Sequence, residues 1–175
     1  MELIYLDNAA TTRTDERVVE EMLPYFTRYY GNASTIYALG EESRKAVTKA
    51  RDIIAAGIGA KPEEIYFTAG GSESDNWALK ATAEAYKEKG KHIITSKIEH
   101  HAILHTCEWL ERQGFEITYL DVDENGSINP ADVEAAIRPD TILISIMFAN
   151  NEIGTIEPIA EIGAIAKAHG VLFHT

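Results

Sequence analysis

The chain has 175 residues, of which 45% are hydrophobic, so it is long and apolar enough to form one domain of common size around a real core. Its formal net charge of −12 argues against binding to nucleic acid or to an anionic membrane surface. Its one cysteine, Cys107, cannot form an internal disulfide, no apolar run approaches the roughly 20 residues that cross a bilayer, and the N-terminus lacks a signal pattern, so we expect a cytoplasmic location.

Two helices are predicted in the first third of the chain, at 15–30 and 39–56. No repeat, linker or low-complexity tract interrupts the sequence after them. We therefore expect residues 1–175 to form a single unit, in which the helical segment 1–60 packs beside a sheet built from the rest of the chain.

Short apolar runs then alternate with helical patterns. Strands are predicted at Ile65–Thr68, His92–Thr95, Glu116–Leu120, Thr141–Met147 and Val171–His174. Helices are predicted at Glu73–Lys89, Ala102–Gln113, Pro130–Ile137 and Pro158–Ala168. This alternation predicts an α/β fold with a mainly parallel sheet and flanking helices.

Glycine and proline mark several of these boundaries. Gly90, Gly114 and Gly170 each follow a helical run, which is typical of a helix terminator in the left-handed conformation. Pro130 and Pro158 stand at helix starts, where a missing N–H costs nothing.

The stretch FTAGGSES places two glycines between a predicted strand and a helix that begins near Ser72. Free N–H groups and the positive end of a helix meet at such a point and can bind an anion, most naturally a phosphate. The stretch matches neither the dinucleotide-binding pattern nor the P-loop. An ordinary turn through Gly70 and Gly71, with Ser72 as the N-cap, explains the same residues equally well.

The stretch KIEHHAIL carries two adjacent histidines at the end of a predicted strand. Adjacent residues on a helix point in different directions, so His100 and His101 make a poor metal pair. His101 and His105 have the favourable i, i+4 spacing, but no third ligand is evident, and we expect no metal site. Because ligands bind beyond the carboxyl ends of parallel strands, His100 is a candidate functional residue.

Amides follow the next apolar strand in the stretch SIMFANNEIGTIEP. Asn150 and Asn151 can donate and accept hydrogen bonds toward a ligand at the end of that strand. Both residues are equally well explained as turn formers before Gly154.

The sequence finishes on VLFHT, a hydrophobic strand that ends with His174 and Thr175 at the same predicted sheet edge. A compact domain rarely ends at the functional edge of its own sheet. We therefore expect further polypeptide to follow.

Taken together, these stretches resemble the successive motifs of cysteine desulfurases of the NifS and IscS type, which are pyridoxal-phosphate enzymes of the class V aminotransferase family. The matching stretches are YLDNAATT, YYGNAS, FTAGGSESDNWAL, EHHAIL, NNEIGTIEPI and VLFHT, in that order. The resemblance implies the N-terminal part of the large pyridoxal-phosphate-binding domain of a fold-type I aminotransferase-like enzyme.

The resemblance also implies roles for individual residues. Gly71 and Ser72 match the pair that binds the cofactor phosphate, with Ser72 in place of the usual threonine. His100 matches the histidine that stacks on the pyridine ring and assists proton transfer. Asn151 matches the asparagine near the cofactor's phenolic oxygen and the substrate.

The family pattern continues beyond Thr175. The aspartate that pairs with the pyridinium nitrogen, the Schiff-base lysine, the sulfur-accepting cysteine and the substrate-binding arginine would all lie further on. Cys107 falls in a predicted helix, and we expect it in the core. Phe148 replaces a histidine found in several relatives, and Ala33 and Tyr37 are smaller departures.

The function implied is the N-terminal half of a split or truncated cysteine desulfurase, which converts L-cysteine to L-alanine and leaves a persulfide on the enzyme. Its partners would be a complementary C-terminal half, a second copy of the complete enzyme and a sulfur-acceptor protein such as one for iron-sulfur cluster assembly. Two alternatives stay open: a non-catalytic protein that binds pyridoxal phosphate or another protein, and half of a selenocysteine lyase or another class V enzyme.

Overall fold

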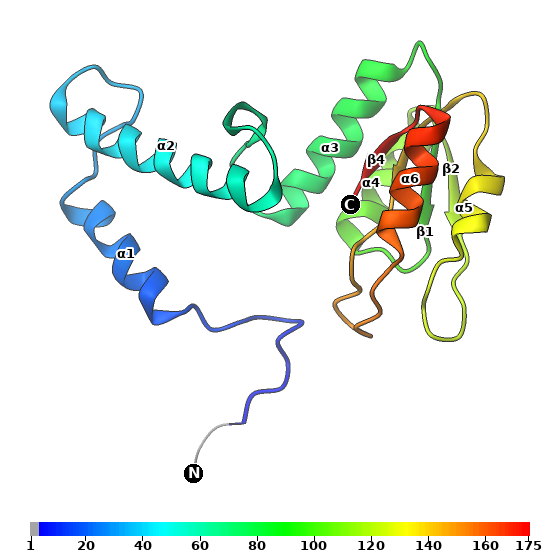
Figure 1. The fold of residues 1–175 in the computed structure, drawn as a ribbon, viewed down its shortest axis with the longest axis horizontal. Helices are drawn as coiled ribbons and strands as arrows, with labels where there is room; N and C mark the ends of the chain where they lie inside the picture. The colour runs from blue at the N-terminus through cyan, green and yellow to red at the C-terminus, as the bar shows by residue number, and fades with distance from the viewer. Residues whose placement is uncertain (1–3) are drawn as a thin grey trace. The chain divides into compact units, whose positions relative to one another are not determined.

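The computed structural model describes residues 4–175, and the chain divides into two compact units at Phe67 and Thr68 (Figure 1). The prediction of one continuous unit with the segment 1–60 beside the sheet stays a prediction, and residues 1–3 of that segment lie outside the described part. Among residues 4–175, no helix is both long and apolar enough to cross a membrane.

The first unit contains helices α1 (Glu16–Thr27) and α2 (Ala38–Ile58) and the 3₁₀ turn η1 (Pro62–Glu64). The Asp15 side chain caps α1 by accepting a hydrogen bond of 2.9 Å from the Arg17 backbone N–H. Helix α2 ends at Gly59 in the left-handed conformation, with φ of 69°. Both helices predicted for this segment are confirmed.

The predicted strand at Ile65–Thr68 is wrong, because this run pairs with no other segment among residues 4–175. It follows η1, and the Arg51 guanidinium donates a hydrogen bond to the Ile65 carbonyl and lies 4.9 Å from the centroid of the Phe67 ring. β-Branched and aromatic residues favour extended backbone, but a strand also needs a neighbouring strand to bond with.

The second unit is built on a parallel sheet of four strands in the order β2-β1-β3-β4. The strands are β1 (His92–Ser96), β2 (Glu116–Leu120), β3 (Thr141–Ser145) and β4 (Leu172–His174). The predicted α/β fold with a parallel sheet is therefore confirmed. Since the strands are parallel, their carboxyl ends all meet at one edge of the sheet.

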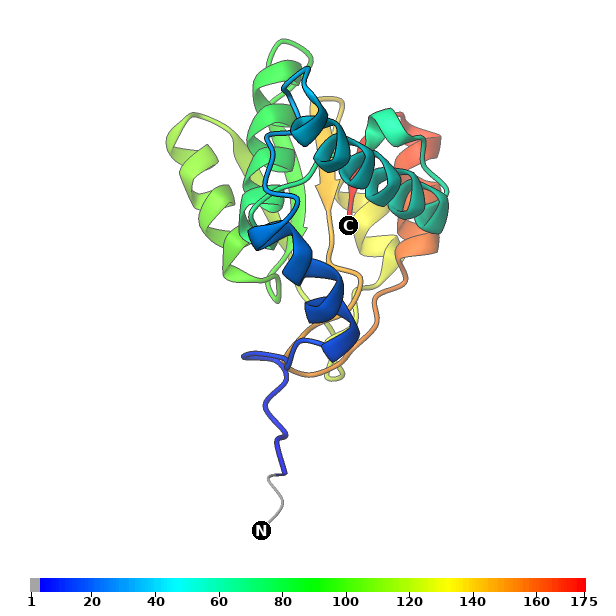
Figure 2. The same cartoon turned by 90° about the vertical axis from the view of Figure 1, so that its left-hand side faces the viewer.

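Helices cover both faces of this sheet, as the two ribbon views show (Figures 1 and 2). Helices α3 (Gly71–Tyr86) and α4 (His101–Arg112) pack side by side on one face. Helices α5 (Pro130–Ala136) and α6 (Ile159–His169) pack on the other. Pro130 opens α5 as predicted, whereas Pro158 is the N-cap of α6 and lies one residue before that helix.

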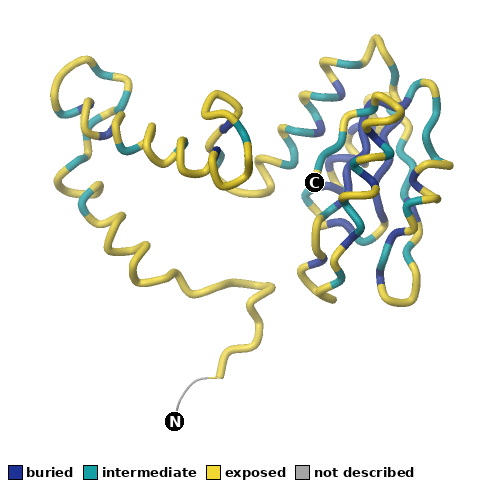
Figure 3. Tube along the Cα trace, viewed as in Figure 1, coloured by how far each residue is buried: buried dark blue, intermediate teal, exposed yellow. Residues whose placement is uncertain are grey.

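Successive side chains of a strand point to opposite faces of the sheet, and this alternation divides the hydrophobic core into two clusters. Ile93 packs with α3 and α4, and its neighbour Ile94 packs with α5 and α6. Both side chains are fully buried, and Figure 3 shows buried residues concentrated on the strands. Cys107 is fully buried in the first cluster, which confirms its predicted place in the core, and burial raises the pKa of its thiol to about 12.

Two of the three glycines predicted to end helices have the expected left-handed backbone, with φ of 86° at Gly114 and 65° at Gly170. The prediction for Gly90 is wrong, because its φ does not lie in the left-handed range. Gly90 is instead required by close packing, since a Cβ atom there would clash with the backbone carbonyl of Asp140.

We expect Gly90→Ala to lower the free energy of unfolding by about 2 kcal/mol, because the backbone of Asp140 must move to admit the methyl group. Urea unfolding followed by circular dichroism measures the loss. Gly57→Ala is the matched control, because a Cβ atom at Gly57 in α2 meets nothing within 4 Å. Equal stability of the Gly90→Ala and parent chains would contradict the close approach.

Candidate functional site

The N-terminus of α3 carries unpaired backbone donors. Gly70 is the N-cap with extended backbone and no side-chain cap, and Ser72 lies inside the helix, so the ordinary turn with Ser72 as N-cap is not formed. The first N–H groups to bond back are those of Glu73 and Ser74, which donate to the Gly70 carbonyl over 3.1 and 3.2 Å. Within residues 4–175, no partner is found for the N–H groups of Gly71 and Ser72, which are free to bind an anion.

The loop before α3 is held by its own polar contacts. The Glu73 carboxylate accepts a hydrogen bond of 2.5 Å from the Ala69 N–H, and the hydroxyls of Thr68 and Ser74 lie 2.6 Å apart. A Cβ atom built on Gly70 or Gly71 meets nothing within 4 Å, so open space adjoins the free donors. This end of α3 therefore has room for a phosphate.

His100 caps the N-terminus of α4. Its Nδ1 atom accepts a hydrogen bond of 3.1 Å from the Ala102 N–H, so a neutral ring carries its proton on Nε2. The next histidines, His101 and His105, stack on each other with centroids 5.2 Å apart and an angle of 13° between their planes. Residues 4–175 contain no group of three or more His, Cys, Asp or Glu side chains that could hold a metal ion.

Ser72 and His100 face the same groove between α3 and α4, which has a volume of about 450 Å³. The two helices begin at Gly71 and His101, so two positive helix ends meet there. Lys80 and Arg112 add the only formal charges of the lining, and both are positive. The groove thus combines free amide donors, a hydroxyl and an imidazole on a chain with a net charge of −12.

A smaller cavity of about 220 Å³ opens at the carboxyl ends of β1, β3 and β4, and His100 lines it as well. His174 and Ser145 share a hydrogen bond of 2.9 Å between Nδ1 and Oγ, and the Nε2 atom of His174 lies 3.8 Å from an oxygen of Asp75. Burial lowers the pKa of His174. Burial also raises the pKa of Glu99, which lines the same cavity, to about 7.

The two asparagines after β3 have different environments. Asn150 is buried, and its Oδ1 atom accepts hydrogen bonds from the N–H groups of Glu152 and Ile153, over 2.8 and 3.0 Å, so it forms the turn. Asn151 is exposed and lines neither the groove nor the smaller cavity.

The structure therefore brings Ser72 and His100 together, with Gly71 beside Ser72 on the same helix end. Glu99 and Asp75, which line the smaller cavity, were not predicted from the sequence as site residues. An acidic residue directly after an apolar strand was the available signal for Glu99, whereas Asp75 lies in a polar run with no distinguishing pattern.

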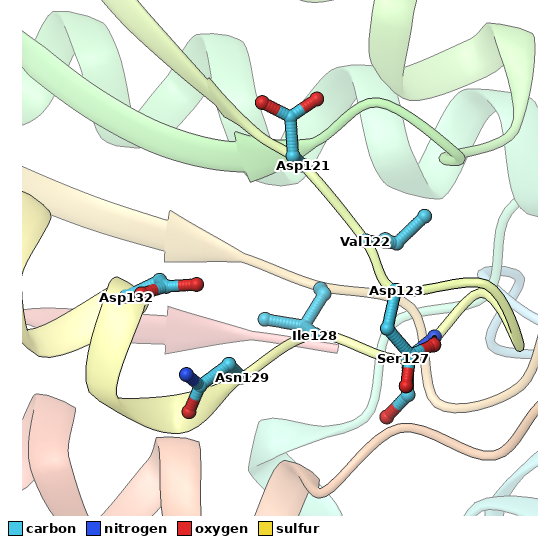
Figure 4. Close-up of a pocket in the computed structure, with 7 residues that line it drawn as sticks. All are labelled: Asp121, Val122, Asp123, Ser127, Ile128, Asn129 and Asp132. Carbon is cyan, nitrogen blue, oxygen red and sulfur yellow. Dashed lines mark hydrogen bonds between the residues drawn. The ribbon is translucent and has the colours of Figure 1, made fainter.

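A third cavity, of about 340 Å³, follows β2 and is shown in Figure 4. Asp121, Asp123 and Asp132 contribute carboxylates to its lining. Figure 4 shows these side chains pointing in different directions rather than toward one centre. The Asp123 carboxylate accepts hydrogen bonds from the N–H groups of Asn125 and Ser127, over 2.9 and 2.8 Å, so it shapes the loop.

Glu157 lies just before α6 and is 3% exposed. One of its oxygens accepts a hydrogen bond of 2.9 Å from the Ile128 N–H, and the other has no partner within the described chain. Burial raises the pKa of Glu157, so its contribution to stability is lost as the pH rises through the folded-state pKa.

We expect Glu157→Gln to raise the free energy of unfolding by about 1 kcal/mol at pH 8, because the amide keeps the acceptor for Ile128 and removes a buried charge. Thermal unfolding at pH 5 and pH 8 measures the effect, which should be larger at pH 8. The exposed Glu152→Gln is the control and should change stability little at either pH. A Glu157→Gln chain less stable than the parent at pH 8 would contradict the prediction.

Comparison with known proteins matches this chain to one protein family. The sequence model of the family described as aminotransferase class-V matches residues 4–175. Cysteine desulfurase IscS of Methanosarcina thermophila is 61% identical over 172 residues, which are 98% of this chain and 43% of that protein.

Among solved structures, a NifS-like protein superposes with a TM-score of 0.94 at 41% identity, covering 98% of this chain and 48% of that one. A structure of SspA in complex with cysteine also has a TM-score of 0.94, at 45% identity, covering 98% of this chain and 49% of the other. The chain thus spans a little under half the length of the proteins it matches.

Proposed function

Because the chain belongs to the class-V aminotransferase family, whose members depend on pyridoxal phosphate, we propose that it is the N-terminal half of a cysteine desulfurase. The identity of 61% to a cysteine desulfurase supports this activity over others in the family. The likeness to a structure that holds cysteine supports L-cysteine as the substrate.

The observation that carries the proposal is the shared groove of Ser72 and His100. The free N–H groups of Gly71 and Ser72, with the Ser72 hydroxyl, bind the phosphate at the positive end of α3. His100 would hold the pyridine ring and would move a proton at Nε2, since its Nδ1 atom accepts the hydrogen bond from the Ala102 N–H. Asn151 follows β3 at the same edge of the sheet, and its exposed amide would be available to hold the cofactor's phenolic oxygen.

When bound, pyridoxal phosphate withdraws electrons from Cα of the substrate amino acid. A cysteine thiolate from the completing half attacks the substrate sulfur and forms an S–S bond. The Cβ–S bond breaks with its electron pair on Cβ, which takes up a proton and becomes the methyl group of alanine. The sulfur remains on the enzyme as a persulfide.

We propose that a C-terminal half completes the enzyme, because the chain spans 43% to 49% of the relatives' lengths. That half supplies the lysine, aspartate, cysteine and arginine of the family pattern. The complete enzyme works as a dimer in the cytoplasm and passes its sulfur to an acceptor protein.

Coexpression with the C-terminal half of the Methanosarcina thermophila relative tests the proposal. We expect a complex with the visible absorbance of bound pyridoxal phosphate and the production of alanine and sulfide from L-cysteine in the presence of a thiol reductant. A complex that binds the cofactor without turnover would favour a non-catalytic protein, and preference for L-selenocysteine would favour a lyase. If the chain carrying Ser72→Asp binds the cofactor as well as the parent does, the phosphate assignment is wrong.

A further inference from the structure

Two buried side chains join the loops that carry His100 and Asn151. The first loop follows β1 and leads into α4 at His100, and the second follows β3 and leads to Asn151. Glu99 is 7% exposed and Asn150 is 8% exposed. Each of these buried residues directly precedes one of the proposed site residues.

Glu99 forms the first connection. Its Oε1 atom accepts a hydrogen bond of 2.9 Å from the Ser96 hydroxyl at the end of β1. The same oxygen accepts another of 2.9 Å from the Met147 N–H, two residues beyond the end of β3. One carboxylate therefore ties the ends of two adjacent strands.

Asn150 forms the second connection. Its Nδ2 atom donates a hydrogen bond of 2.9 Å to the Ile98 carbonyl in the loop after β1. Its Oδ1 atom organises the turn after Asn151 through the N–H groups of Glu152 and Ile153. A single amide thus holds the turn together and fastens it to the loop that precedes His100.

We propose that Glu99 and Asn150 are positioning residues, which together fix the place of His100 relative to Asn151 and couple that place to the protonation of Glu99. The proposal rests on the proposed function only for what His100 and Asn151 bind. The connections themselves exist without any ligand and can be tested without one.

Charge supports the coupling to protonation. Asp75 from α3, His100 and His174 share the cavity of Glu99. Cys107 from α4 and Glu157 from the segment before α6 interact with it electrostatically. Burial is the main cause that raises the pKa of Glu99 to about 7, with Asp75 and Glu157 adding to it. A carboxylate accepts stronger hydrogen bonds than a carboxylic acid, so its ionisation tightens the contacts with Ser96 and Met147.

Nuclear magnetic resonance of the full ¹⁵N-labelled chain tests the first connection. We expect the amide shifts of Met147 and Asn151 to change with pH around a midpoint of about 7. Glu99→Gln should abolish this change while leaving the chain folded, because the glutamine oxygen accepts the same two hydrogen bonds. An Asn151 amide that shows no such change, or one that keeps it in Glu99→Gln, would overturn the coupling.

Hydrogen exchange tests the second connection. Asn150→Ala should speed the exchange of the Glu152 and Ile153 amides at least about 10-fold, since both lose their acceptor, and leave the strand amides of β1 unchanged. Asn129→Ala is the matched control, because Asn129 caps α5 elsewhere in the unit. Should Asn150→Ala fail to fold, Asn150→Asp keeps the Oδ1 acceptor and loses the bonds that Nδ2 donates to the Ile98 carbonyl and, over 3.5 Å, to the Met147 sulfur. The Asn151 amide of this variant should lose the pH response.

These outcomes are separate from the proposed function. If the Asn151 amide does not respond to the protonation of Glu99, the proposed binding of pyridoxal phosphate to the completed enzyme is unaffected. A chain that shows the coupling but binds no pyridoxal phosphate would refute the function and keep the positioning roles.

Discussion

The proposed desulfurase, completed by the proposed C-terminal half, is expected to lose about 100-fold or more of its cysteine turnover when His100 is replaced by alanine. His100 lines the groove that also contains Ser72, and it lines the cavity at the carboxyl ends of the strands. It therefore lies between the proposed phosphate position and the strand ends. Alanine removes both the stacking surface and the Nε2 proton. The rate of alanine formation from L-cysteine measures the loss, and the visible spectrum of the bound cofactor reports on the stacking independently.

His169→Ala is the control for this experiment. His169 ends α6 on the opposite face of the sheet and is exposed, with one contact of 3.2 Å to Glu134. Its loss should leave turnover and spectrum unchanged. A His100→Ala enzyme with full turnover and an unchanged spectrum would remove His100 from the site.

Replacing His92 by alanine is expected to lower the free energy of unfolding by about 3 kcal/mol, the largest stability effect that we predict. His92 is fully buried at the start of β1. Its Nδ1 atom lies 2.7 Å from the Thr141 hydroxyl and its Nε2 atom 2.8 Å from the Thr118 hydroxyl, so one ring joins the three strands β2, β1 and β3. Alanine leaves a cavity and two hydroxyls without this partner.

The same substitution should change the pH dependence of stability. Burial lowers the pKa of His92 from its ordinary value of 6.5. Below pH 6.5, His92 therefore binds a proton in the unfolded chain but not in the folded chain. The free energy of unfolding then decreases by up to about 1.4 kcal/mol for each unit by which the pH is lowered. His92→Ala removes this contribution and leaves that of the partly buried His174, whose pKa burial also lowers.

Urea unfolding between pH 5 and pH 8 measures both effects. His169→Ala serves again as the matched control and should change stability by less than about 0.5 kcal/mol. If His92→Ala costs no more than this control at pH 8, the ring does not join the strands as described. An unchanged slope on the acid side would contradict its neutral state in the fold.

Local patterns in the sequence were enough for most of the fold. Apolar runs of strand length, such as Thr141–Met147, lie between helical patterns, and this alternation allows few arrangements other than a parallel sheet covered on both faces. The run Ile65–Thr68 has the same local character and forms no strand. The residues of this run favour an extended backbone, but a strand forms only where the tertiary structure places a neighbouring strand beside it.

The sequence by itself also predicted the helix start near Ser72 and the strand end before His100, because such boundaries can be recognised from adjacent residues, and the family resemblance added the cofactor-binding roles expected of both. Only the tertiary structure placed these two residues on one groove, buried Glu99 and Asn150, and left Asn151 outside the lining. Glu99 contacts Met147, 48 residues away, and Asn150 contacts Ile98, 52 residues away. Such contacts depend on the order of the strands in the sheet, which adjacent residues in the sequence do not determine. The pKa of Glu99 is raised by burial, and this burial exists only when the strands are packed in the folded chain.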